Sequence, residues 1–312
     1  MILHNKKVLV TGGAGFIGSH LVDKLVKKGA RVTVIDNLFS GYLSNLELSK
    51  EKIIYKNIDI RNGEKLRKVM RNQDVIFHLA ANADVPYSVV HPEEDFEINI
   101  VGSYNILQNA LKNKVKKIVF ASSAAVYGDA VYTPVDEKHL TVPISPYGAS
   151  KLAIERLGYS YYKAYGLPFV TMRIFNTYGE RQSRYVMYDL LKKLYKNDSE
   201  LEVLGTGDQR RDYSYVSDTV AAFILAAESD KSNGQVYNIS GGKTVSIKRL
   251  VEMLTKMLKI EKIDVHYMQK SWVGDINVLS ADISKIKKEL KFIPKVPLDE
   301  SLKRLNIWLK DR

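Results

Sequence analysis

Tyr147 and Lys151 lie four residues apart in the segment 145–151, a spacing that puts both side chains on one face of a helix. A phenol with a pKa of about 10 is a poor base at neutral pH, but a neighbouring ammonium group favours its phenolate form. The pair could then remove a proton from a substrate hydroxyl. The chain has 19 tyrosines, so the pair taken alone also fits an ordinary amphipathic helix.

A further hydroxyl group lies at the end of the apolar segment 117–121. Ser123 follows that segment closely, at the point where a predicted strand ends. Its hydroxyl can hydrogen-bond the same substrate oxygen from which Tyr147 would take a proton. Ser123, Tyr147 and Lys151 are therefore the predicted catalytic residues.

The start of the chain carries a glycine-rich turn. An apolar run, 8–10, leads into 11–18 with glycines at positions 12, 15 and 18, and an amphipathic helix pattern follows. Gly12 allows a tight turn, Gly15 allows close approach of the backbone to a pyrophosphate, and Gly18 allows the helix to pack closely on the strand. This order of strand, turn and helix is typical of dinucleotide binding.

The second predicted strand, 31–35, is followed by Asp36. An acidic residue about 20 residues beyond the glycines accepts a hydrogen bond from the adenosine ribose, and its charge repels the additional phosphate of NADP. We therefore expect NAD as the cofactor.

Strand and helix patterns alternate along the first half of the chain. After Asp36 they cover strands at 52–55, 74–79, 117–121 and 167–173 and helices at 64–71, 96–113 and 216–228. Alternation of this kind predicts an α/β fold, a doubly wound parallel-sheet Rossmann domain whose ligand lies beyond the carboxyl ends of the strands.

Two parts of the chain lack this rhythm. We expect the Rossmann domain to comprise 1–175 and about 214–240, and a smaller mixed α/β C-terminal substrate domain to comprise about 176–213 and 241–312. No internal repeat is visible.

Composition narrows the class of protein. The net charge of +12 comes from lysines scattered over many helices, which indicates a solvated surface and no nucleic-acid partner. The absence of cysteine excludes disulfides and thiolate chemistry, and the six dispersed histidines favour no metal site. The start of the chain enters a strand almost at once and no apolar stretch is long enough to span a membrane, so we expect a cytoplasmic protein.

These motifs make the chain similar, over essentially its whole length, to the extended short-chain dehydrogenase/reductase superfamily, in its NAD-dependent nucleotide-sugar epimerase/dehydratase branch. The resemblance implies a nucleotide-sugar substrate and a tightly bound NAD. The cofactor set that the motifs and the resemblance imply is Gly12, Gly15, Phe16, Ile17, Gly18, Asp36, Asn37, Ser40, Gly41, Asp59, Ile60, Leu79, Ala80, Ala81, Asn99, Ser122, Tyr147 and Lys151. The corresponding substrate set is Ser123, Tyr147, Asn176, Tyr185, Arg211, Trp272 and Asp275.

Two positions after Ser123 bear on the reaction. The dehydratases and decarboxylases of this branch carry acidic residues there, whereas this chain has Ala124 and Ala125, which cannot transfer a proton. The pattern is most similar to UDP-glucose 4-epimerases of the compact archaeal and bacterial type. It implies interconversion of UDP-glucose and UDP-galactose by transient oxidation at C4.

Trp272 departs from many epimerases, which have a diphosphate-binding arginine at that position. Arg181, Arg184 or Arg210 could supply the missing charge, and the sequence does not choose among them. Action on another nucleotide sugar, a UDP-N-acetylhexosamine, a UDP-uronate or a CDP- or dTDP-sugar, therefore stays open. The alternative of a non-catalytic NAD(H) sensor also stays open, although a sensor would have no use for a base such as Tyr147.

The resemblance also implies a homodimer formed through the helices at 99–113 and 151–165.

Overall fold

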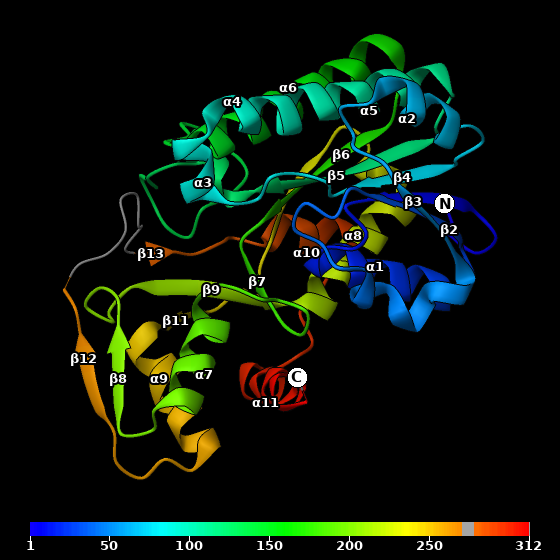
Figure 1. Cartoon of the computed structure of the whole chain (residues 1–312). Helices are drawn as coiled ribbons and strands as arrows, with labels where there is room; N and C mark the ends of the chain where they lie inside the picture. Colours follow the sequence, from blue (N-terminus) through cyan, green and yellow to red (C-terminus); the bar gives the residue numbers. More distant parts are fainter. Residues whose placement is uncertain (270–277, 312) are drawn as a thin grey trace.

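A seven-stranded parallel sheet forms the centre of the larger part of the molecule (Figure 1). The computed structural model describes residues 1–269 and 278–311. The strands lie in the order β10-β6-β5-β4-β1-β2-β3, which confirms the predicted doubly wound fold. Their bounds are β1 (Lys7–Thr11), β2 (Arg31–Asp36), β3 (Ile53–Asn57), β4 (Val75–His78), β5 (Lys117–Ser123), β6 (Phe169–Ile174) and β10 (Val236–Ile239).

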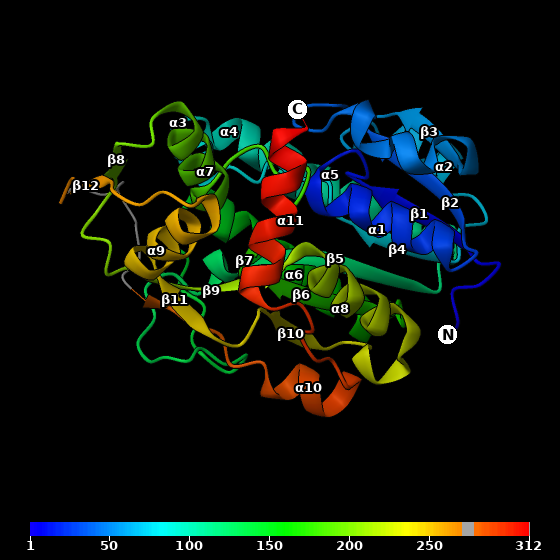
Figure 2. The ribbon, with the colours of Figure 1, turned by 90° about the horizontal axis from the view of Figure 1, so that it is seen from below.

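Helices cover both faces of this sheet (Figures 1 and 2). One face carries α2 (Gly63–Val69), α3 (Val85–Val90), α4 (Pro92–Asp95), the π-helix η2 (Phe96–Val101), α5 (Gly102–Lys112) and α6 (Pro146–Tyr165). The other carries α1 (Phe16–Lys27), α8 (Val216–Glu228) and α10 (Ser284–Leu290). Short 3-10 turns occur at η1 (Leu43–Lys52), η3 (Ala124–Val126) and η4 (Asp230–Ser232).

The alternation of side chains along β1 explains the two layers. Val8 and Val10 belong to the hydrophobic core on the α1 side, whereas Leu9 between them belongs to the core on the α5 side. Because both faces of a parallel strand are buried, its sequence is a continuous apolar run. Each layer of helices therefore has a hydrophobic core of its own.

The main differences between the observed and the predicted elements concern one helix and three strands. The helix expected at 96–113 begins as the π-helix η2 before α5 continues it. The strands expected at 52–55 and 167–173 are shifted toward the C-terminus by up to two residues. The edge strand β10 was not predicted, because four residues are too short to show a period. The helix expected at 216–228 is confirmed.

A smaller layer lies beyond the carboxyl ends of the central strands (Figure 1). It contains a sheet of β11 (Thr244–Ser246), β9 (Arg210–Tyr215) and β13 (Val278–Leu279), with β7 (Asn176–Tyr178) also paired to β9. β8 (Glu200–Val203) pairs with β12 (Asp264–Tyr267). The helices are α7 (Val186–Lys196), α9 (Ile247–Leu258) and α11 (Leu298–Lys310).

The C-terminal helix α11 connects the two parts. Asn306 accepts a hydrogen bond from Tyr195 of α7, and Ser301 bonds Tyr178 of β7. Just before α11, the backbone N–H groups of Lys295 and Val296 donate to the Asp218 carboxylate of α8 at 3.0 and 3.1 Å. Among the described helices, none combines the length and apolar character that crossing a bilayer needs.

Candidate functional site

Helix α6 positions Tyr147 and Lys151. Pro146 occupies its first turn, and the Ser145 hydroxyl caps the helix by accepting a hydrogen bond from Gly148 N at 3.1 Å. The helix therefore begins just before Tyr147, and the four-residue spacing brings Lys151 Nζ to 5.7 Å from the centre of the Tyr147 ring.

The Tyr147 phenol is buried beside Ser123. The side chain is 8% exposed, and burial raises the pKa of Tyr147, while its hydrogen bond with Ser123 and the charge of Arg184 lower it. Ser123 ends β5, and its Oγ accepts a hydrogen bond from Ala125 N at 3.2 Å. A tyrosine in this setting becomes a base only if positive charge stabilises its phenolate.

Lys151 can provide that charge. Its side chain is 4% exposed, and burial lowers the pKa of Lys151 to about 8, against the opposing charges of Asp95 and Glu155. Lys151 Nζ donates to the Ala121 carbonyl oxygen at 3.0 Å. An ammonium has three donors, so two remain beyond that contact.

The glycine turn between β1 and α1 leaves no room for side chains. Gly12 has φ +69°, and a Cβ there would lie 2.6 Å from the backbone N of Ala80. A Cβ on Gly18 would lie 2.1 Å from the Gly12 carbonyl oxygen. Gly15 precedes α1 without a side-chain cap, so the first N–H groups of that helix point to the turn and can hold an anion.

Asp36 joins the glycine turn to the end of β2. One carboxylate oxygen accepts a hydrogen bond from Ala14 N at 2.9 Å and the other from Leu38 N at 2.8 Å. Burial raises the pKa of Asp36, and these two backbone bonds oppose the rise. A carboxylate has about four acceptor positions, so Asp36 can also accept bonds from ribose hydroxyls.

Most other members of the predicted cofactor set line the ends of the same strands. Asp59 lies after β3, where Arg61 pairs with it at 2.7 Å and lowers its pKa, and Asn37 donates to it at 3.0 Å. Phe16 and Ile17 begin α1, Ser40 and Gly41 follow β2, Ile60 packs against Gly102, and Leu79, Ala80 and Ala81 follow β4.

Asn99 and Ser122 are held by protein groups. The Asn99 side chain donates to the Asn82 carbonyl at 3.0 Å and accepts from Asn82 N at 2.9 Å, which fixes the loop after β4. The Ser122 hydroxyl donates to the buried carboxylate of Glu155. Asn99 therefore fixes the loop after β4, and the Ser122 hydroxyl proton is already used by Glu155.

Apart from Ser123 and Tyr147, the described members of the predicted substrate set lie in or next to the smaller layer: Asn176 in β7, Arg211 in β9 and Tyr185 just before α7. Asn176 donates to the Asp212 carbonyl at 3.4 Å, Arg211 to the Arg210 carbonyl at 3.0 Å, and Tyr185 to the Ala83 carbonyl at 3.2 Å. Trp272 and Asp275 lie outside the described residues.

The three arginines proposed to replace the missing diphosphate ligand have different surroundings. Arg181 pairs with Asp23 of α1 at 2.7 Å, and Arg210 donates to Thr244 of β11. Arg184 pairs with Asp84 at 2.7 Å. Of the three, Arg184 is the one whose charge lowers the pKa of Tyr147.

Sequence reasoning missed the buried polar groups that lie around the predicted catalytic residues. Asp95 lies beside Asn99 and Ser150. Glu155 forms a buried ion pair with Arg173 at 2.6 Å. His78 lies between the hydroxyls of Thr11 and Ser103. The i, i+4 spacing of Asp95 and Asn99 was visible in the sequence, whereas the other contacts join distant segments.

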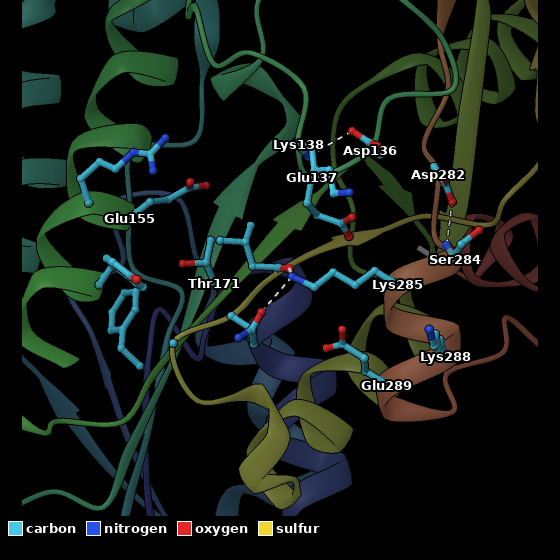
Figure 3. Close-up of a pocket in the computed structure, with 16 residues that line it drawn as sticks. Asp136, Glu137, Lys138, Glu155, Thr171, Asp282, Ser284, Lys285, Lys288 and Glu289 are labelled. Atoms are coloured by element: carbon cyan, nitrogen blue, oxygen red, sulfur yellow. Dashed lines mark hydrogen bonds between the residues drawn. The ribbon is translucent and has the colours of Figure 1, made fainter. Parts of the chain in front are cut away.

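A cavity of about 560 Å³ lies away from this crevice, at the β10 edge of the central sheet (Figure 3). Figure 3 shows Glu155 from α6 and Lys285 from α10 pointing into it from opposite sides. Lys285 donates to the Val236 carbonyl at 2.9 Å, and Glu289 accepts from Tyr237. Both of these charged groups therefore bond polar groups of β10. The residues that line the cavity do not include Ser123, Tyr147 or Lys151.

The sheet, the glycine turn and the Ser123, Tyr147 and Lys151 group together define a short-chain dehydrogenase/reductase. The model of the family described as GDP-mannose 4,6 dehydratase matches residues 9–305. The chain belongs to this family of extended short-chain dehydrogenases/reductases, the nucleotide-sugar epimerases and dehydratases, and has nucleotide-sugar epimerase/dehydratase activity.

Three similar proteins illustrate the range of the family. A putative UDP-glucose 4-epimerase of Methanocaldococcus jannaschii is 36% identical over 97% of this chain and 98% of its own. The UDP-N-acetylglucosamine 4-epimerase of Methanobrevibacter ruminantium, solved with UDP-N-acetylmuramic acid, has a TM-score of 0.93 at 36% identity over 99% of each chain. The UDP-glucuronic acid 4-epimerase of Bacillus cereus, solved with UDP-glucuronic acid and NAD, has a TM-score of 0.90 at 32% identity over 98% and 99%. These relatives act on different sugars, so similarity alone leaves the substrate open.

Proposed function

We propose that the protein is an NAD-dependent UDP-glucose 4-epimerase, which interconverts UDP-glucose and UDP-galactose by transient oxidation at C4 of the sugar. The observation that carries this proposal is the group of Ser123, Tyr147 and Lys151 beside two alanines. Ala124 and Ala125 supply no additional acid or base, so the site can oxidise a sugar alcohol and reduce it again but has no residue there for expelling water. The similarity to the putative epimerase of M. jannaschii supports the same assignment.

Tyr147 is the proposed base. It takes the proton of the sugar 4-hydroxyl while Ser123 hydrogen-bonds the same oxygen, and it returns the proton after the keto sugar has turned over in the pocket. Lys151 stabilises the phenolate through its charge, 5.7 Å from the ring centre. NAD, when bound, would accept the hydride from C4 and give it back on the opposite face.

The residues present fit NAD. The crowded turn at Gly12 and Gly18 brings bare backbone and the N-terminus of α1 together where a pyrophosphate would lie. Asp36, fixed by two backbone bonds, would hold the adenosine ribose. Because one cofactor serves both half-reactions, we propose that it stays tightly bound.

The larger part of the chain, 1–175 with about 214–240, is the proposed cofactor domain, and 176–213 with 241–312 the sugar-nucleotide domain. Within the second set, α10 packs against β10 of the central sheet. Asn176, Tyr185 and Arg211 are proposed to contact the substrate from the second domain, together with Trp272 and Asp275. Arg184 is the proposed additional cation, because its charge acts on Tyr147.

We also propose a cytoplasmic homodimer. The outer faces of α5 and α6 expose Tyr104, Tyr159 and Tyr165, an apolar surface that a second copy of the pair would cover as a four-helix contact. Sedimentation equilibrium of the wild type and of Tyr159→Glu tests this, since a charged side chain in the contact should shift the mass toward the monomer.

A panel of nucleotide sugars tests the activity. Purified protein whose bound NAD has been quantified is incubated without added cofactor with UDP-galactose, UDP-N-acetylglucosamine and UDP-glucuronate, and the products are separated by chromatography. We expect UDP-glucose from UDP-galactose. If only another nucleotide sugar is converted, that sugar becomes the assigned substrate in place of UDP-galactose. A preparation that contains NAD but converts none of the three sugars would overturn the proposal.

A further inference from the structure

Asp95 is a buried carboxylate near the catalytic residues that the mechanism above does not use. It ends α4, its side chain is 1% exposed, and α4 packs against α6. One carboxylate oxygen accepts a hydrogen bond from Asn99 Nδ2 at 2.8 Å. Burial raises the pKa of Asp95, and the nearby Ser150 hydroxyl, the charge of Lys151 and the Asn99 bond oppose the rise. Ser150 is the neighbour of Lys151 in the chain. Asp95 is therefore held in place beside the turn of α6 that carries the catalytic lysine.

The partners of Asp95 are themselves fixed. Asn99 also donates to the Asn82 carbonyl at 3.0 Å and to Ser150 Oγ at 3.3 Å. Ser150 Oγ in turn bonds the Tyr147 carbonyl oxygen at 2.9 Å. This buried network joins the loop after β4, the end of α4 and the first turns of α6. If Asp95 swung away from the network, its own buried carboxylate would lose the Asn99 donor, and an unsatisfied buried polar group costs about 1–3 kcal/mol, more when it is charged.

Lys151 needs a counter-charge in this environment. A fully buried ammonium without a negative partner tends to lose its proton, because desolvation disfavours the charged form. Burial already lowers the pKa of Lys151 to about 8, and Asp95 is the strongest of the charges that oppose this. Among the described residues of α6, Lys151 is the cation beside the Tyr147 ring, so the phenolate would lose this stabilising charge if Lys151 were neutral.

The other groups around Lys151 do not fill this role. The Glu155 carboxylate also faces it, but Arg173 binds that carboxylate through two guanidinium nitrogens and neutralises it. On β4, burial lowers the pKa of His78 to about 3, so this imidazole is neutral. On β5, Lys151 meets a carbonyl oxygen and the ring of Phe120, 5.1 Å away. The charge of Arg184 and the phenol of Tyr185 act on Tyr147.

We propose that Asp95 is the counter-ion of Lys151, a positioning residue that keeps the ammonium charged while Tyr147 changes its protonation state. The role in turnover rests on the proposed epimerase function, whereas the pairing of the two charges does not. In an epimerase the proton that Tyr147 removes is returned to the sugar, so the site needs no path for protons to solvent. A fixed buried carboxylate suits this cycle, because it holds the lysine charge constant through both half-reactions.

Direct titration of Lys151 tests the pairing without any substrate. The protein is labelled with ¹³Cε-lysine, the Lys151 resonance is assigned by its loss in Lys151→Arg, and its titration is followed by NMR in the wild type and in Asp95→Asn. Loss of a nearby negative charge should move the midpoint to lower pH by about one unit or more. Asp218→Asn, which alters a buried carboxylate of α8, should leave it in place. An unchanged midpoint in Asp95→Asn would overturn the proposal.

The pH dependence of kcat supplies the readout for turnover. In Asp95→Asn the acidic limb of the pH profile should move to lower pH, because the negative charge that raises the pKa of Tyr147 is gone. The alkaline limb should also move to lower pH, because it follows the pKa of Lys151. Asp95→Glu should restore both in part. A purely structural role would reduce kcat with neither limb displaced. Should Asp95→Asn not fold, Asp95→Ser removes the same charge and keeps a hydroxyl for Asn99. If no sugar is turned over while the lysine titration still shifts, the epimerase assignment fails and the electrostatic effect of Asp95 on Lys151 stands.

Discussion

The ammonium group of Lys151 lies over the ring of Tyr147, with Nζ 5.7 Å from the ring centre. One turn of α6 separates the two residues, and the lysine Nζ is anchored on the Ala121 carbonyl of β5. The anchor couples the helix to the sheet end at which Ser123 lies. The position of the ammonium beside the phenol is therefore set by the packing of α6 on β5 and by the bond to Ala121.

Replacement of the Tyr147 phenol should slow turnover strongly and leave most of the bound NAD in place. For Tyr147→Phe we expect kcat to fall about 10²- to 10⁴-fold, the usual contribution of a general base. NAD content of the purified protein should stay within about twofold. Tyr159→Phe, an exposed tyrosine of the same helix, is the control. A Tyr147→Phe enzyme with wild-type kcat would exclude the phenol as the base and favour a non-catalytic role for the fold.

The charge of Asp36 should set cofactor choice. Asp36→Asn keeps an acceptor for one backbone N–H but no longer repels a phosphate, so we expect NADH to bind about tenfold more weakly and NADPH to bind more tightly. Fluorescence titration with both nucleotides measures the ratio. Asp74→Asn, a carboxylate at the opposite end of the sheet, should change neither affinity. If Asp36→Asn still prefers NADH over NADPH as strongly as the wild type, Asp36 does not bind the adenosine ribose.

A methyl group at Gly18 should damage the cofactor turn. Its Cβ would lie 2.1 Å from the Gly12 carbonyl oxygen, so the turn must move. We expect a loss of about 1–3 kcal/mol in unfolding free energy and loss of most of the bound NAD. At Gly63 the nearest heavy atom to such a methyl is 3.5 Å away, so Gly63→Ala should retain both properties. Calorimetry and cofactor quantification check the pair, and equal behaviour of the two variants would contradict the prediction.

His78 should make the fold sensitive to acid. Burial lowers its pKa from 6.5 to about 3, and its ring bonds the hydroxyls of Thr11 and Ser103 at 2.7 and 2.8 Å. The unfolded state therefore binds the additional proton first, and stability is lost as the pH falls from about 6.5 toward 3, by about 1.4 kcal/mol per pH unit.

Urea unfolding at pH 6.5 and 5.0 measures this loss, for which about 2 kcal/mol is expected from this group. His78→Gln should unfold with a smaller difference between the two pH values, because the titrating ring is gone. His266→Gln, an exposed histidine of β12, should retain the wild-type difference. If His78→Gln shows the full wild-type difference, the acid sensitivity has another source.

The sequence by itself determined the central sheet, because buried parallel strands are continuous apolar runs and the turn between β1 and α1 needs glycine at fixed positions. It also placed Tyr147 and Lys151 on one face of a helix, since that relationship is local. The short edge strand β10 and the π-helical segment that contains Asn99 could not be predicted, because four to six residues carry no clear period.

Only the tertiary structure decided what surrounds those side chains. The pairing of Glu155 with Arg173, the enclosure of His78 by Thr11 and Ser103, and the approach of Asp95 to α6 join segments that are 18 to 67 residues apart or lie on different helices. Such contacts depend on which strands become neighbours in the sheet and on how helices pack against it. The electrostatic environment of Tyr147 and Lys151 follows from that packing, because burial and fixed charges, and not the residue types alone, set their protonation.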